Sequence, residues 1–213
     1  MLKGIIFDFD GVIAESVHIK SAAFSDLYKS YGSEIVTRIV KHHEANGGMC
    51  RYTKIKYYHE NFLNTILSDQ EIYHIANQFS KYVIDKIVNA KYVPYALEFI
   101  KQNYGNYKLF ISTGTPTTEM KKILKLKKII NFFTGVYGSP ALKNEHVNII
   151  CAQYKLKSDE LLFFGDSMID LEAATAHGIK FILRLHKYNK KYFQNYSGQK
   201  IYGFKSLDMV SII

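Results

Sequence analysis

The chain has 213 residues, of which 47% are hydrophobic, and a formal net charge of +9. This length allows one large domain or a core with a small second unit, and the apolar content suffices for a hydrophobic core. The positive charge comes almost entirely from scattered lysines without a basic tail, and arginine occurs only at Arg38, Arg51 and Arg184. An anionic small molecule, or solubility alone, explains this charge as well as nucleic acid does, and we do not expect nucleic acid as the partner.

The cysteines and the N-terminus indicate the compartment. Cys50 and Cys151 are far apart and lack the spacing of a zinc site or a disulfide framework. The first residues form an apolar run that leads straight into acidic residues, which is unlike a signal peptide. No apolar stretch approaches the ~18 residues that a membrane span needs. We expect a reduced, cytoplasmic protein without membrane contact.

Short apolar runs alternate with helical patterns over most of the chain. The run at 4–9 ends in acidic residues and Gly11, which predicts a buried strand followed by a loop. Similar runs occur at 108–112, 135–138, 161–164 and 180–183, and helical patterns lie between them at roughly 116–127, 144–155 and 169–177. This alternation predicts a doubly wound α/β core, in which helices cover both faces of a parallel sheet.

Residues 16–90 follow a different pattern, in which apolar stripes have helical spacing and no strand interrupts them. The stripes comprise Ala23, Phe24, Leu27, Tyr28 and Tyr31; then Ile55, Tyr58, Phe62 and Ile66; and then Ile72, Ile75, Ala76, Phe79, Val83 and Ile87. The α/β pattern resumes near Pro94. We predict an all-helical unit over 16–90, inserted into a core made of 1–15 and 91–213.

Two acidic residues, Asp8 and Asp10, follow the first predicted strand. Residues i and i+2 of a strand point to the same side. Carboxylates placed in this way repel each other, so their burial requires a neighbouring cation. A hard divalent ion such as Mg²⁺ suits oxygen ligands. Two surface acids at the end of a strand are the alternative interpretation.

A second segment, Ser112, Thr113 and Gly114, stands at a strand-to-helix junction. Its hydroxyl and free backbone N–H groups could hold phosphate, although the same residues could simply cap the helix near Pro116. Lys143 precedes another helix, where it could neutralise phosphate or orient an aspartate. A solvated surface lysine is the alternative.

A third segment places Asp166 and Asp170 at a strand end and helix start, where carboxylates suit both the helix N-terminus and a metal ion. Asp170 alone could be a helix cap. Loops at the carboxyl ends of parallel strands converge on one crevice. We therefore expect the following side chains to meet there: Asp8, Asp10, Ser112, Lys143, Asp166 and Asp170.

The motifs DFDGVIAES, STGT, the lysine after GSP, and GDSMIDLEAA occur in the order and spacing of the haloacid dehalogenase superfamily. Over essentially its whole length the chain resembles the phosphatase and phosphomutase branch. The resemblance implies a Rossmann-like core with a helical cap between the first and second motifs, and a Mg²⁺-dependent hydrolase of a small phosphorylated metabolite. Because Asp10 is present, the dehalogenase and phosphonate-cleaving branches are disfavoured.

The resemblance also implies roles for the acids. Asp8 would be the nucleophile that forms a phospho-aspartate, and Asp10 the general acid and then the general base. Asp166 would bind Mg²⁺ with Asp8 and with the backbone carbonyl of Asp10, and Asp170 would support the ion through water or through Lys143.

The remaining implied roles concern phosphate. Ser112, the N–H of Thr113 and Gly114 would hold phosphoryl oxygens, and Lys143 would offset the negative charge of Asp8 and the phosphate.

The cap is expected to select the substrate. Two glycines precede Arg51, which could bind a second anionic group or could be a solvated helix residue. Glu15, Ser16, His18 and Lys20 could also face the cleft. We expect a sugar phosphate or a sugar acid phosphate as substrate.

Two other functions stay open. One is phosphoryl transfer like that of β-phosphoglucomutase, for which the cap would have to exclude water. The other is a non-catalytic binding module, which the intact acids disfavour. We expect a monomer or a weak homodimer.

Overall fold

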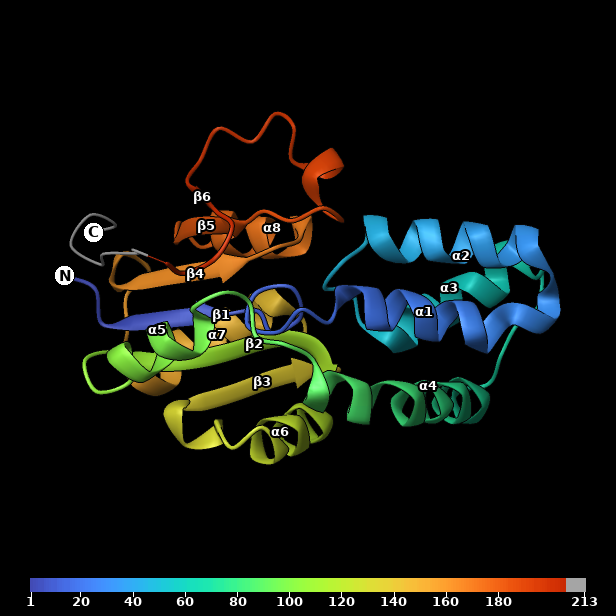
Figure 1. Ribbon diagram of the computed structural model, residues 1–213, viewed down its shortest axis with the longest axis horizontal. Helices are drawn as coiled ribbons and strands as arrows, with labels where there is room; N and C mark the ends of the chain where they lie inside the picture. Colours follow the sequence, from blue (N-terminus) through green and yellow to red (C-terminus); the bar gives the residue numbers. More distant parts are fainter. Residues whose placement is uncertain (206–213) are drawn as a thin grey trace.

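The computed structural model describes residues 1–205, which form a parallel sheet with helices on both faces and a helical unit at one end (Figure 1). The strands are β1 (Gly4–Phe7), β2 (Lys108–Pro116), β3 (Gly135–Ser139), β4 (Leu161–Gly165), β5 (Lys180–Arg184) and β6 (Lys200–Ile201). Their order is β3-β2-β1-β4-β5-β6, with every neighbouring pair parallel. The predicted doubly wound α/β core is therefore confirmed. Because β1 lies between β2 and β4, the connections diverge beside it, where such sheets form a crevice.

Alternate residues of β1 enter different cores. Ile5 and Phe7 belong to the core under α5 (Ala96–Asn103) and α6 (Thr117–Leu126). Ile6 belongs to the core under α7 (Lys143–Tyr154) and α8 (Met168–Ala176). This alternation is the strand period of two, and it explains why β1 is apolar throughout.

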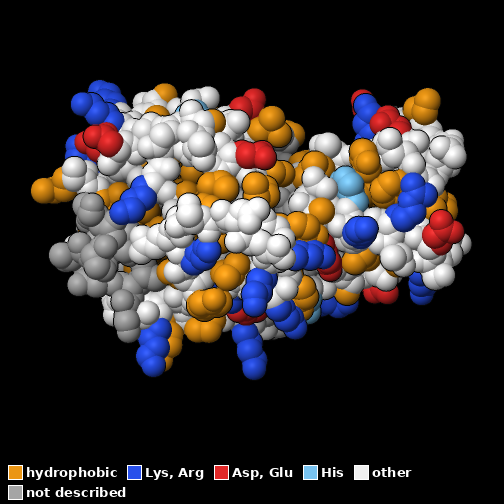
Figure 2. All heavy atoms as spheres, turned by 90° about the horizontal axis from the view of Figure 1, so that it is seen from above, with side chains coloured by type: hydrophobic (Ala, Val, Ile, Leu, Met, Phe, Trp, Pro, Cys, Tyr) orange, Lys and Arg blue, Asp and Glu red, His pale blue; other side chains and the backbone are white. Residues whose placement is uncertain are grey.

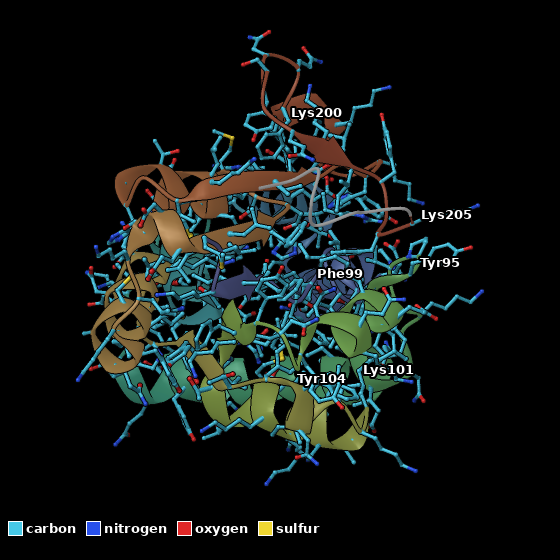
Figure 3. The ribbon with its side chains drawn as sticks, turned by 90° about the vertical axis from the view of Figure 1, so that its left-hand side faces the viewer. Tyr95, Phe99, Lys101, Tyr104, Lys200 and Lys205 are labelled. Atoms are coloured by element: carbon cyan, nitrogen blue, oxygen red, sulfur yellow. The ribbon has the colours of Figure 1, made fainter. Side chains whose placement is uncertain are left out.

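The end of the core remote from the cap shows how α5 packs. Figure 3 views this end, with Phe99 towards the middle and Tyr104 further out. Phe99 is 3% exposed and lies 5.0 Å from the ring of Phe204, whereas Tyr104 is 52% exposed. Phe7 stacks on Phe164 in the same core, with ring centroids 5.3 Å apart. Aromatic rings of the chain therefore serve packing here.

Four helices make up the cap, drawn at the right of Figure 1: α1 (Val17–Tyr28), α2 (Ser33–Ala45), α3 (Arg51–Phe62) and α4 (Asp69–Asn89). All lie within the segment 16–90 that the sequence assigns to the inserted unit. The rings of Phe24, Tyr58 and Phe79 form its centre, with Phe24 4.4 Å from Phe79 and 5.5 Å from Tyr58. No helix of residues 1–205 has both the length and the apolar character to cross a bilayer.

Several boundaries differ from the sequence prediction. The helix α3 ends at Phe62, and Asn64 adopts a positive φ of 51°, so Ile66 leaves the predicted stripe and is 89% exposed. Tyr31 lies beyond α1 in a 3₁₀ turn and is 49% exposed. The strand β2 continues to Pro116, through the segment predicted as a junction. Helices α2 and α5 and the two-residue β6 were not predicted separately.

One buried ion pair joins the cap to the core. The guanidinium of Arg51 on α3 donates two hydrogen bonds to Glu119 on α6, of 2.9 Å from Nη1 to Oε2 and 2.6 Å from Nη2 to Oε1. Ser80 on α4 donates from Oγ to Glu119 Oε2 over 2.7 Å. The side chains of Arg51 and Glu119 are only 5% and 7% exposed. A bidentate pair shielded from water in this way fixes the relative position of α3 and α6.

Glu119→Ala should therefore destabilise the protein strongly. The substitution leaves Arg51 buried without its counter-ion, which costs roughly 3–5 kcal/mol. Urea unfolding of the two proteins measures the difference. The control is Glu60→Ala, which removes the exposed partner of Lys56 at 3.9 Å and should cost less than about 0.5 kcal/mol. If Glu119→Ala lowers the free energy of unfolding no more than Glu60→Ala does, this account of the ion pair is contradicted.

Candidate active site

The site begins at a close approach between the loops that follow β1 and β4. Gly11 has a positive φ of 81°, and a Cβ added there would collide with Asp166 Oδ2. Only glycine combines this backbone conformation with the absence of a side chain. Gly11 therefore lets the loop carrying Asp8 and Asp10 lie directly against the loop carrying Asp166.

Three carboxyl groups meet at this point. Asp8, Asp166 and Asp170 each offer an oxygen, and these oxygens lie within 4.8 Å of one another. All three residues are buried. Burial raises the pKa of Asp8 well above its ordinary value, although Lys143 opposes the shift. Burial, together with repulsion from Asp170, raises the pKa of Asp166 to about 8. An all-oxygen group of this kind, poor in compensating charge, could hold a hard divalent cation.

Lys143, the first residue of α7, supplies one positive charge. Its Nζ lies 3.2 Å from Asp8 Oδ2 and also contacts Asp170 Oδ1. Burial alone would lower the pKa of Lys143, but the charges of Asp170 and Asp8 outweigh it and raise the pKa. Asp170 Oδ2 accepts hydrogen bonds from Ser167, of 2.6 Å from Oγ and 3.0 Å from the backbone N–H. Asp170 thus caps α8 and positions Lys143 at the same time.

Asp10 lies beside this group but bonds to the cap. Ser16 Oγ donates to Asp10 Oδ1 over 2.6 Å, and Lys20 on α1 forms an ion pair with Oδ2. Lys20 Nζ also donates to Thr115 Oγ1 over 2.9 Å. Burial alone would raise the pKa of Asp10, but the charge and hydrogen bond of Lys20 and the hydrogen bond of Ser16 together lower it. Asp10 is therefore a carboxylate in this arrangement.

The predicted phosphate-binding segment divides between two sides of β2. Thr113 and Gly114 line the cavity, whereas Ser112 Oγ lies 2.9 Å from His146 Nδ1. His146 Nε2 lies 3.3 Å from the Gly138 carbonyl, so the hydrogen-bond pattern assigns Nε2–H and leaves Nδ1 to accept from Ser112. Burial lowers the pKa of His146 to about 4, which keeps the ring neutral. Ser112 thus lies behind the site.

Thr113 is better placed than Ser112 to meet a ligand. Its Oγ1 accepts a hydrogen bond of 3.2 Å from the backbone N–H of Thr115, which leaves the hydroxyl proton available. The signal that distinguishes the two residues is strand alternation, because neighbours on β2 point to opposite faces. Ending the strand at residue 112 concealed this alternation.

A cavity runs from these residues into the cap. Its core side includes Asp8, Asp10, Thr113, Gly114 and Asp166, and its cap side includes Lys20, Phe24, His43, Lys54 and Phe79. Figure 2 shows the surface hollowed between the core and the cap, with Lys and Arg side chains spread over the face. Core and cap residues therefore meet around a single space.

The cap also reaches over the site with its backbone. Gly48 has a positive φ of 79°, and a Cβ added there would lie 2.9 Å from Ser167 Oγ and 3.4 Å from Lys143 Nζ. A Cβ on Gly114 would collide with the Gly48 carbonyl. The two loops approach this closely because both carry glycine, so the cap loop covers Lys143.

The structure shows partners for three residues that the sequence did not predict. Arg51 lines the cavity, but its guanidinium is bound to Glu119 and Ser80. His186 follows β5, and its Nε2 lies 2.8 Å from Asp166 Oδ2. Asn189 donates from Nδ2 to the Asp166 carbonyl over 2.8 Å. A loop at the carboxyl end of a strand was the available signal for His186 and Asn189.

Two further residues of the first motif region have partners other than the three acids of the cluster. Glu15 pairs with Arg184 of β5, with 3.2 Å between Oε2 and Nη1. His18 stacks on Tyr188, with ring centroids 6.4 Å apart. Cys50 and Cys151 are free thiols and are both partly buried.

Comparison with known proteins identifies the family. Residues 5–184 match the family model of haloacid dehalogenase-like hydrolases. A phosphoglycolate phosphatase of Haemophilus influenzae (strain 86-028NP) is 25% identical over 202 residues, which cover 88% of this chain and 87% of the relative.

Solved structures share the fold. One is β-phosphoglucomutase from Clostridium difficile, with a TM-score of 0.79 at 17% identity over 100% of this chain and 96% of the other. Another is a protein from Haemophilus somnus described as a predicted phosphoglycolate phosphatase, with a TM-score of 0.75 at 20% identity over 99% and 97%. The chain thus belongs to the haloacid dehalogenase-like hydrolases, and the enzyme class expected from its motifs, a hydrolase of the phosphatase type, is confirmed.

Proposed function

We propose that the protein is a Mg²⁺-dependent phosphomonoester hydrolase that acts on a small phosphorylated metabolite through a phospho-aspartate at Asp8. The observation that carries the proposal is the meeting of Asp8, Asp166 and Asp170 within 4.8 Å, with Lys143 3.2 Å from Asp8. A phosphoryl group adds negative charge to a cluster of three carboxyl groups whose own charge Lys143 compensates only in part. Its entry requires a divalent cation beside Lys143, and charge neutralisation of this kind is what phosphoryl transfer mainly needs.

The residues fit such an ion. Asp8 and Asp166 would hold Mg²⁺ together with the backbone carbonyl of Asp10. Asp170 already accepts hydrogen bonds from Lys143 and Ser167, so it would act mainly by holding these partners in place. When bound, Mg²⁺ supplies positive charge that draws the phosphoryl oxygens towards Asp8. The hydroxyl of Thr113, the N–H groups of Thr113 and Gly114, and Lys143 would bind the same oxygens.

The first step forms the covalent intermediate. A carboxylate oxygen of Asp8 bonds to phosphorus while the bond from phosphorus to the leaving oxygen breaks. Asp10, which takes up a proton from solvent as the phosphorylated substrate binds, gives that proton to the leaving oxygen, and the alcohol product departs. The charge of the arriving phosphate raises the pKa of Asp10 and so opposes the effect of Lys20.

The second step regenerates the enzyme. Asp10, now a carboxylate, takes a proton from water as the water oxygen bonds to phosphorus. The bond between Asp8 and phosphorus breaks, and inorganic phosphate leaves. Ser16 and Lys20 hold Asp10 throughout, and both belong to the start of the cap.

Phosphoryl transfer between two positions of a sugar is the second candidate. The observation that favours it is the cap loop over Lys143, because a mutase must keep water from the phospho-aspartate. Incubation with a hexose 1-phosphate and a catalytic amount of the bisphosphate separates the two reactions. Formation of the 6-phosphate isomer indicates the mutase, and release of inorganic phosphate indicates the hydrolase.

Substitutions of the two aspartates of the first motif should block different steps of the reaction. With p-nitrophenyl phosphate, whose leaving group needs no protonation, Asp10→Asn should still form the phosphoenzyme but hydrolyse it slowly. Asp8→Asn should form none and lose about 10³-fold or more in turnover. Acid-quenched samples with labelled substrate measure the phosphate bound to protein.

The control for both variants is Asp159→Asn, which changes an exposed acid and should behave like the wild type. Near-normal turnover or labelling of Asp8→Asn would eliminate Asp8 as the nucleophile.

Magnesium should stabilise the folded protein through the acidic cluster. A ligand present at about 100 times its Kd stabilises by about 2.7 kcal/mol, which is readily detected as a rise in Tm. Asp166→Asn should raise the Tm of the metal-free protein, because it relieves repulsion, and should lose most of the Mg²⁺-dependent rise. Asp159→Asn should retain it. An equal rise in Tm for Asp166→Asn and the wild type would place the ion elsewhere.

A further inference from the structure

Lys54 is a buried cation that has no acidic partner among the residues the structure describes. It lies on α3, one turn after Arg51, is only 2% exposed and lines the cavity. Its Nζ lies 2.8 Å from His43 Nδ1 and 3.3 Å from the His43 carbonyl. Within residues 1–205 no carboxylate forms an ion pair with it.

The other cations around the cavity are all compensated. Lys143 pairs with Asp8 and Asp170, Lys20 pairs with Asp10, and Arg51 pairs with Glu119. An uncompensated buried charge is costly. Consistent with this, burial and the nearby charge of Lys20 lower the pKa of Lys54 to about 7.

His43 does not supply the missing charge. Burial and Lys54 lower the pKa of His43 well below its ordinary value, so its ring is neutral and offers one lone pair. An ammonium group has three donors. The two contacts with His43 leave the third donor of Lys54 for a group in the cavity.

The position of Lys54 suits the far end of a substrate. It shares the cavity with Asp8 and Asp10, but it comes from the cap side, beside Phe24 and Phe79. The two rings lie 4.4 Å apart and give this side of the cavity an apolar wall. A ligand with its phosphoryl group at Asp8 can therefore extend towards Lys54.

We propose that Lys54 binds a second anionic group on the substrate, a carboxylate or a further phosphate, and so selects phosphorylated metabolites that carry two anionic groups. The inference rests on the proposed phosphatase function. It moves the role that the sequence suggested for Arg51 to a lysine three residues later, because Arg51 is held by Glu119 and Ser80.

The test uses two substrates that differ in one group. In 2-phosphoglycolate a carboxylate occupies the position of the hydroxymethyl group of 2-hydroxyethyl phosphate. The wild type should have at least a tenfold higher kcat/KM for phosphoglycolate. Lys54→Met should lower kcat/KM for phosphoglycolate by roughly 30-fold or more, as for truncation of a buried charge partner, mainly through KM. Turnover of 2-hydroxyethyl phosphate should stay within about twofold, because that substrate has no second anionic group to pair with Lys54.

A second pair of substrates identifies the anion. Xylulose 1,5-bisphosphate compared with xylulose 5-phosphate tests for a second phosphate in the same way. The inference is supported if Lys54→Met loses kcat/KM selectively for phosphoglycolate or for the bisphosphate. The substrate that shows this loss identifies the second anionic group as a carboxylate or a phosphate.

The control variant is Lys56→Met, on the same helix with a 63% exposed side chain, which should leave both substrates unaffected. Lys54→Met should unfold at a Tm no lower than that of the wild type, because it removes an uncompensated charge while keeping most of the side chain's length. If that variant does not fold, Lys54→Gln and the wild-type preference itself provide the same test.

Two results would overturn the inference. One is equal use by the wild type of substrates with and without the second anionic group. The other is a proportional loss of both substrates in Lys54→Met, which indicates a structural role only. Absence of phosphate release from any substrate by the wild type, p-nitrophenyl phosphate included, would instead overturn the proposed function.

Discussion

Three buried carboxyl groups held against their mutual repulsion are the constraint on which the rest of the structure depends. Asp8 comes from β1, and Asp166 and Asp170 come from the loop and helix after β4, so the neighbouring parallel strands bring them together. Gly11 permits the close approach, and Lys143 compensates part of the charge. In the proposed function, the uncompensated part would attract a divalent cation and the phosphoryl group that such a cation brings.

The cap completes this arrangement from the other side. Lys20 and Ser16 bond to Asp10, the Gly48 loop lies over Lys143, and the pair of Arg51 and Glu119 joins the two units. The cap therefore contributes both to the surroundings of Asp10 and to the walls of the cavity. In such an arrangement substrate choice and chemistry are coupled, because a ligand must satisfy the cap and the acids together.

Much of this could be predicted from the sequence. Strands β1 to β5 follow from apolar runs, and the parallel order explains why Asp8, Lys143 and Asp166 converge. Other features depend on contacts that no local pattern reveals. Glu119 lies 68 residues from Arg51, so the sequence could not show that this arginine is already paired. The strand β2 extends beyond its apolar run, so the alternation of the strand continues through these residues. As a result Thr113 lines the cavity, whereas Ser112 lies against His146. Lys54 resembles any other lysine until its burial is known.

Anomalous diffraction from crystals grown with Mn²⁺ and a tetrahedral phosphate analogue would test the central claim most directly. The account predicts one metal peak about 2.1–2.3 Å from oxygens of both Asp8 and Asp166, with the central atom of the analogue facing a carboxylate oxygen of Asp8. A fully occupied metal elsewhere, or an analogue bound away from Asp8 with the carboxyl cluster empty, would contradict it.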